Sequence, residues 1–143
     1  PHFDQAAVIS RMRKSTSAIK SVLLNQNIIS GIGNIYADES LWRAKVNWTV
    51  PASRLSPARL NDLVNHARQV MTEALAQGGT SFDSLYVNVN GESGYFSREL
   101  DVYGRENEPC NRCGRLIARQ PFAGRSSFLC TRCQPRPRSG KTP

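Results

Sequence analysis

The chain has 143 residues, 39% of them hydrophobic, which suits one modest core with a smaller satellite module, and 19 basic against 11 acidic side chains give a formal net charge of +8. No apolar run approaches the roughly 20 residues of a membrane-spanning helix, and the first residues lack the basic and apolar regions of a signal peptide. We therefore exclude a membrane protein and expect a cytosolic one.

The chain begins with two short helical patterns. Asp4 is a suitable N-cap for a helix that continues to about Lys14. A second helix is predicted over residues 18–25, because apolar side chains recur there at helical spacing. The apolar side chains of Ile19, Val22 and Leu23 face inward and leave Lys20 on another face of the helix.

A glycine-containing turn follows, with the sequence Gly31-Ile32-Gly33-Asn34. A third helix is predicted from about Asn34 to about Ala44. The start of a helix offers backbone N–H groups and a positive dipole end, and glycines beside it allow close approach, so the turn could hold a phosphate. Glycine pairs before helices are common, so the motif is weak by itself. Asp38 and Glu39 are interpreted as side chains that complement the helix dipole.

The longest predicted helix occupies residues 56–77. Ser56 is its N-cap, Pro57 is its first helical residue, and Gly78 and Gly79 end it. Its apolar side chains recur at i, i+3 and i+4, which predicts a stripe that faces the core. The stripe consists of Leu60, Leu63, Val64, Ala67, Val70, Met71, Ala74 and Leu75. A turn-rich loop is predicted over residues 88–94.

All four cysteines lie in two C-x-x-C pairs, Cys110 with Cys113 and Cys130 with Cys133, sixteen residues apart. Two such pairs can direct four thiolates at one tetrahedral Zn²⁺ and leave no open coordination position. The residues between the pairs are enough for a β-hairpin. We therefore predict one structural zinc ion; two disulfides, or four reduced thiols, are the alternatives.

The positive charge is concentrated in the same part of the chain. Residues 1–109 carry 11 basic and 11 acidic side chains, whereas residues 110–143 carry eight basic side chains and no acidic one. A zinc-stabilised hairpin with this charge is typical of a protein that binds a polyanion. The alternative is that the arginines only keep the surface soluble.

Several of these segments together resemble the C-terminal half of bacterial formamidopyrimidine-DNA glycosylase. They lie at residues 20–26 (KSVLLNQ), 31–41 (GIGNIYADESL), 77–80 (QGGT), 94–96 (GYF), 102–105 (VYGR) and 123–126 (AGRS), followed in family order by the second cysteine pair. The resemblance implies a mainly α-helical helix-two-turns-helix domain followed by a small β-hairpin zinc finger. We expect the first over residues 1–104, the second over residues 105–134, and a basic disordered tail over residues 135–143.

The resemblance also implies roles for individual residues in binding duplex DNA. It implies that Asn34 and Arg125 contact phosphates, and it suggests Tyr103 as a third phosphate contact. Lys20 would assist as a point charge. The turn glycines Gly31 and Gly33 would let the backbone approach the phosphate. Residues 89–97 resemble the family's segment that closes over an extruded oxidised purine. The expected partner is double-stranded DNA, including damaged or abasic DNA, bound by a monomer.

The chain departs from the family pattern at its first residues. Family members begin with Pro-Glu, whose proline amine attacks the sugar, whereas this chain begins Pro1-His2. We therefore assign no catalytic residue and expect a DNA-binding module that does not catalyse by itself. Two alternatives stay open: a glycosylase and abasic-site lyase, through Pro1 or a separate catalytic domain, and a zinc-ribbon adaptor for protein or RNA.

Overall fold

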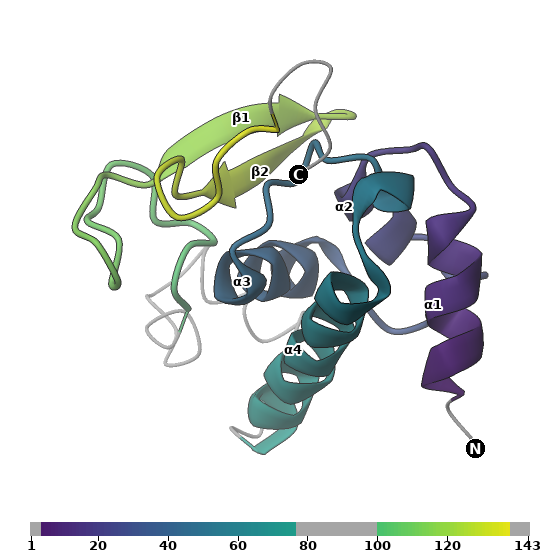
Figure 1. The fold of residues 1–143 in the computed structure, drawn as a ribbon. Helices are drawn as coiled ribbons and strands as arrows, with labels where there is room; N and C mark the ends of the chain where they lie inside the picture. Colours follow the sequence, from purple (N-terminus) through teal and green to yellow (C-terminus); the bar gives the residue numbers. More distant parts are fainter. Residues whose placement is uncertain (1–3, 77–99, 138–143) are drawn as a thin grey trace.

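The computed structural model describes residues 4–76 and 100–137. In Figure 1 the helices form the lower and right-hand part of the molecule, and a two-stranded hairpin covers one end of them. The elements in chain order are α1 (Gln5–Arg13), α2 (Ile19–Leu23), α3 (Asn34–Ala44), the 3-10 helix η1 (Ala52–Arg54), α4 (Pro57–Ala76), β1 (Ala118–Phe122) and β2 (Arg125–Leu129). The predicted fold class, a helical bundle followed by a β-hairpin with four clustered cysteines, is confirmed.

Local signals place the ends of the main helices. The Asp4 carboxylate accepts a hydrogen bond from Ala7 N at 3.1 Å, and the Ser56 hydroxyl accepts one from Arg59 N at 3.1 Å. Each contact satisfies one of the backbone donors that the first turn of a helix leaves unpaired. Helix α3 has the predicted bounds and ends at Lys45, which adopts a left-handed conformation with φ 61°.

The core lies where α3 and α1 pack against α4. The predicted stripe of α4 supplies buried side chains from Leu60 to Ala74. Leu75 is an exception, because 69% of its surface is exposed. Gly31 also packs closely here: its φ of +94° belongs to the left-handed region, and an added Cβ would lie 3.0 Å from Met71 Cε.

The strands β1 and β2 form an antiparallel hairpin in which Ala118 is paired with Leu129 and Phe122 with Arg125. Ala123 and Gly124 connect them, both with positive φ (44° and 79°), as in the tight turns that match the twist of a hairpin. β2 is the strand that packs against α3. Figure 1 shows the hairpin lying across α3, on the side away from the lower end of α4.

The second helix differs from its prediction. It occupies only Ile19–Leu23, because the chain turns back at Asn25, whose N–H donates to Val22 O. Three predictions lie outside the described residues: the end of the long helix at Gly78 and Gly79, the loops over residues 88–94 and 89–97, and most of the tail. No helix in the described ranges is long and apolar enough to cross a membrane.

Candidate metal centre and nucleic-acid interface

The four cysteine sulfurs converge on one point. Their Sγ atoms all lie within 4.8 Å of one another. Each C-x-x-C pair forms a tight turn, or knuckle, and between the two knuckles the Sγ atoms of Cys110 and Cys133 are 3.9 Å apart and those of Cys113 and Cys130 are 3.5 Å apart. Four sulfurs at about 2.3 Å from a tetrahedral Zn²⁺ stand about 3.8 Å apart, whereas a disulfide needs about 2.05 Å. The residues therefore fit zinc and do not fit two disulfides.

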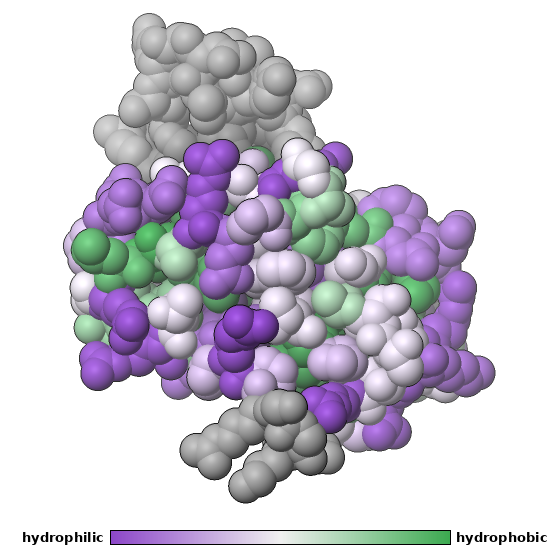
Figure 2. All heavy atoms as spheres, turned by 90° about the horizontal axis from the view of Figure 1, so that it is seen from above, coloured by the Kyte–Doolittle hydropathy of each residue, from purple (hydrophilic) through white to green (hydrophobic). Residues whose placement is uncertain are grey.

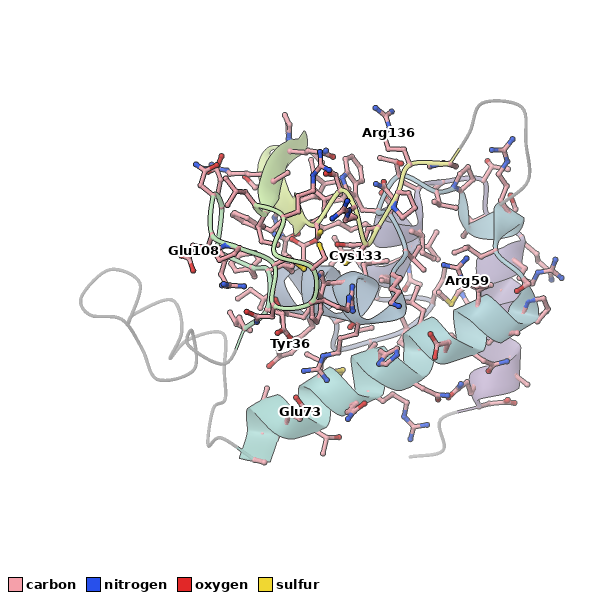
Figure 3. All side chains as sticks on the ribbon, turned by 60° about the vertical axis from the view of Figure 1, so that its left-hand side comes forward. Tyr36, Arg59, Glu73, Glu108, Cys133 and Arg136 are labelled. Carbon is pink, nitrogen blue, oxygen red and sulfur yellow. The ribbon has the colours of Figure 1, made fainter. Side chains whose placement is uncertain are left out.

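Backbone and side-chain N–H groups point at these sulfurs. Arg112 N donates to Cys110 Sγ at 3.4 Å, and Cys133 N donates to Cys130 Sγ at 3.4 Å, as the tight knuckle turns require. Two side-chain donors join them: Trp42 Nε1 lies 3.3 Å from Cys110 Sγ, and Arg112 Nε lies 3.3 Å from Cys133 Sγ. Figure 3 labels Cys133 beside α3, the helix that carries Trp42.

The glycine turn leads directly into α3. Gln26 holds it from within, since its side chain accepts from Gly31 N at 2.9 Å and donates to Ile32 O at 3.1 Å. Gly33 is the N-cap in an extended conformation that any residue can adopt (φ −101°, ψ −176°). No side chain of the described residues forms a capping hydrogen bond at this end of the helix.

Asn34 is the first residue of α3, and its side chain is turned toward the hairpin. Its Nδ2 donates to Ser126 O at 3.1 Å, and only 7% of the residue is exposed. Its Oδ1 is buried without a hydrogen-bond partner among the described residues. The start of α3 and the tip of the hairpin are therefore in direct contact.

Lys20, predicted on another face of α2 than the apolar side chains, is buried in the structure. Its side chain is fully buried, and its Nζ lies 2.8 Å from Asp38 Oδ1, 2.8 Å from Ser127 Oγ and 3.2 Å from Ser126 O. The helical period placed Lys20 off the apolar face of α2, but that side of the helix is covered by α3 and β2. The Lys20 ammonium therefore contacts the hairpin and not solvent.

Asp38 completes this ion pair and also binds the hairpin backbone. Its second oxygen accepts from Phe128 N at 2.9 Å. Burial raises the pKa of Asp38 to about 6, against the opposing effects of the Lys20 ammonium and the Phe128 N–H. Burial likewise lowers the pKa of Lys20, with Asp38 opposing and the nearby Arg125 charge adding to the effect.

Glu39 fastens the segment that leads into the zinc module. One of its oxygens accepts from Asp101 N at 2.8 Å, and the other accepts from Val102 N and Tyr103 N at 2.9 Å each. Burial raises its pKa to about 7, and these three N–H groups oppose the shift. The interpretation of Asp38 and Glu39 as side chains that complement the helix dipole is therefore wrong: both are buried acceptors for long-range contacts.

Arg125 and Tyr103 occupy different environments. Arg125 is exposed as the first residue of β2, directly after the tight turn, and it is close enough to Lys20 to influence its pKa. Tyr103 is half-buried, and its ring meets the ring of Phe128 edge-on at a centroid distance of 4.9 Å. Phe128 also packs beside the cysteines.

Four further residues that the sequence did not single out join the modules. Gln134 Nε2 donates to Val46 O at 3.0 Å, its Oε1 accepts from Cys130 N at 2.9 Å, and its carbonyl accepts from Asn47 Nδ2 at 2.9 Å. Gln134 and Asn47 are two of the four residues. The other two are Trp42 and Arg112, which make the sulfur contacts described above. Each of the four residues makes at least one contact that spans 68 or more positions, and no local sequence signal could have identified that contact.

Two family models match the chain. Residues 1–85 match the formamidopyrimidine-DNA glycosylase H2TH domain, and residues 107–136 match the zinc finger found in FPG and IleRS. The second match agrees with the sulfur geometry, and together they confirm the prediction of one structural zinc ion held by four cysteines.

Curated relatives and solved structures agree with these matches. Formamidopyrimidine-DNA glycosylase of Mycolicibacterium gilvum is 65% identical over 96% of this chain, and that of Mycolicibacterium smegmatis is 61% identical over 96%. The chain spans about half the length of these relatives, 49% and 48%.

The MutM (Fpg) protein of Thermus thermophilus has a TM-score of 0.81 at 35% identity, covering 92% of this chain and 50% of that one. A complex of Lactococcus lactis Fpg with abasic-site DNA gives 0.81 at 35% identity, covering 94% and 48%.

Removal of zinc by a chelator should unfold the hairpin and leave much of the helical core intact. The hairpin module has little core of its own and depends on the metal, whereas the α1, α3 and α4 core does not contact the sulfurs except through Trp42. Far-ultraviolet circular dichroism should keep most of its helical signal, while Trp42 fluorescence changes. A complete loss of the helical signal would show that the helices need the metal too.

Replacing Lys20 by Met should destabilise the fold by about 3–5 kcal/mol, because it leaves the buried Asp38 carboxylate without its counter-charge. The double variant Lys20→Met with Asp38→Asn should recover most of this loss, since the amide oxygen can still accept from Phe128 N. Chemical denaturation of both variants measures the difference. Equal stability of the single and double variants would contradict the ion pair's role.

Proposed function

The chain belongs to the formamidopyrimidine-DNA glycosylase family, and on this premise we propose that it binds duplex DNA through the phosphate backbone, as a monomer in the bacterial cytosol. The observation that carries this proposal is the contact between the start of α3 and the tip of the hairpin. Asn34 donates to the carbonyl of Ser126, the residue next to Arg125, at 3.1 Å. The residue that carries the guanidinium therefore neighbours a residue bound to the start of α3, and a helix N-terminus and a guanidinium are the two groups best suited to a phosphate.

The charge distribution supports a polyanionic partner. Among the described residues, six arginines lie between residues 110 and 137, namely Arg112, Arg115, Arg119, Arg125, Arg132 and Arg136. Seen from the hairpin side, hydrophilic side chains spread over much of the surface, with smaller hydrophobic areas between them (Figure 2). Such a surface favours phosphate contacts, which position a protein on the duplex without reading its sequence.

Each predicted site residue receives a defined part in this proposal. Arg125 contacts a phosphate directly, and the turn from Gly31 to Gly33 presents the start of α3 to it. Asn34 keeps the hairpin beside that turn and also contacts the phosphate itself. Lys20 acts indirectly, through Ser126 and Ser127. Tyr103 adds a further contact to the DNA backbone.

The two modules bind as one unit in this proposal. We assign residues 1–104 to the helix-two-turns-helix domain, residues 105–134 to the zinc finger and residues 135–143 to a basic tail. The boundary at residue 134 is supported by Gln134, whose side chain is buried between Val46 and Cys130. Because buried contacts from Lys20 and Gln134 cross between the modules, the two modules present a single, fixed surface to DNA.

A second candidate function is favoured by the relatives, which are named as glycosylases, and by a solved Lactococcus lactis complex with abasic-site DNA. Under this alternative the chain takes part in base excision and abasic-site cleavage. We propose that the chain alone binds such DNA without reacting with it. Borohydride treatment of the protein on an abasic duplex distinguishes the two, because only a Schiff base gives a covalent adduct, and an adduct would favour the enzyme.

Replacing Arg125 by Ala should weaken DNA binding roughly tenfold or more at moderate salt, because one charge-assisted contact is worth about 1.5–3 kcal/mol. The loss should be similar for unrelated sequences, and the slope of log affinity against log salt should fall by about 1. Mobility-shift titrations in a salt series measure both quantities.

Arg13→Ala is the matched control, because it removes the same charge from an exposed position on α1, away from the hairpin. Both variants should retain zinc. If the control loses as much affinity as Arg125→Ala, the effect is one of net charge, and the proposed contact is wrong.

A further inference from the structure

Two side chains outside the cysteine set connect the zinc centre to α3. Trp42 Nε1 donates to Cys110 Sγ at 3.3 Å, and Arg112 Nε donates to Cys133 Sγ at 3.3 Å. Arg112 Nη2 also donates to Trp42 O at 2.7 Å, and its Cζ lies 3.8 Å from the centre of the Trp42 ring. The two side chains therefore hold each other while each binds one sulfur.

These contacts differ from the backbone N–H contacts that tight knuckle turns provide. Trp42 lies in another module and reaches Cys110 from 68 positions away. Arg112 lies inside the first knuckle but binds a sulfur of the second one, 21 positions away. Arg132 occupies the equivalent place in the second knuckle, and both arginines are exposed, but of the two only Arg112 binds a sulfur through its side chain in the part of the chain that the structure describes. The two knuckles are therefore not equivalent, and only the first carries this pair of contacts among the described residues.

The charge of the centre explains what these donors do. Four thiolates on one Zn²⁺ carry a net charge of about −2, held mostly by sulfur. An N–H that donates to a thiolate withdraws electron density and makes the sulfur a weaker nucleophile. Trp42 is 7% exposed and Cys110 is 4% exposed, so water competes little for their contact. Arg112 adds a full positive charge next to Cys133.

We propose that Trp42 and Arg112 are positioning residues of the zinc centre, which lower the reactivity of the Cys110 and Cys133 thiolates and slow release of the metal. The stacked guanidinium and indole orient both donors, and α3 supplies the rigid support. Outer hydrogen-bond partners of metal ligands have this effect elsewhere, with losses of about 10- to 100-fold in metal affinity when they are removed. The proposal concerns the metal and is independent of DNA binding.

The first test uses the whole chain loaded with Co²⁺ in place of zinc. Trp42→Phe keeps an aromatic ring and removes the N–H, so the sulfur-to-cobalt charge-transfer band should move to longer wavelength. Trp48→Phe is the matched control, because its indole N–H donates to Gln120 Oε1 at 2.8 Å and not to a sulfur. Its band should stay where it is in the unchanged protein. An unshifted band in Trp42→Phe, or equal shifts in both variants, would overturn the proposal.

The second test compares Arg112→Ala with Arg132→Ala in the zinc-loaded chain. Zinc transfer to a chromogenic chelator and alkylation of thiols by iodoacetamide should both be roughly tenfold faster in Arg112→Ala. Arg132→Ala loses the same charge at the same knuckle position and should match the unchanged protein. Arg112→Lys, which keeps the charge but not the planar stack, should restore little of the protection. Equal rates for the two alanine variants would contradict a role for the Arg112 contact.

Discussion

The buried ion pair between Lys20 and Asp38 determines where the zinc hairpin lies. Removing two charges from water is costly, and the attraction between them offsets that cost only if their remaining hydrogen-bonding groups are also satisfied. Here Ser127 Oγ and Ser126 O accept from the ammonium, and Phe128 N donates to the carboxylate. All three partners belong to β2. The pair is therefore satisfied in one position of the hairpin, which gives the contact its specificity.

Helix α3 is the element to which the other parts of the site are attached. Asn34 at its start contacts the hairpin tip, Asp38 and Glu39 in its middle hold β2 and residues 101–103, and Trp42 near its end reaches a zinc ligand. Asn34, Asp38 and Trp42, at i, i+4 and i+8, thus fix the zinc module along one face of the helix, and Glu39 fastens the segment before it. In return, the metal gives the small hairpin the stability that its limited core cannot provide.

This arrangement relates the metal to the proposed phosphate site without a direct contact between them. Zinc holds the base of the hairpin, and the ion pair holds its β2 strand against α3. Arg125 is the neighbour of Ser126, whose carbonyl binds Asn34 at the start of α3, so the two groups proposed to bind phosphate belong to segments in contact. The structural role of the zinc and the electrostatic role of the arginine are therefore separate, although the same 30-residue module carries both.

The sequence by itself determined the features that depend on neighbouring residues. Capping by Asp4 and Ser56, the apolar stripe of α4, the bounds of α3 and the cysteine spacing are local patterns, and the structure agrees with them except at Leu75 and in the length of α2. Only the tertiary structure decided the state of Lys20, Asp38 and Glu39. From the sequence alone, a charged side chain near an apolar stripe is expected to be exposed to solvent. Only the tertiary structure shows whether a distant segment covers it. Asp38 meets the backbone of Phe128, 90 positions away, and helical periodicity contains no information about that contact.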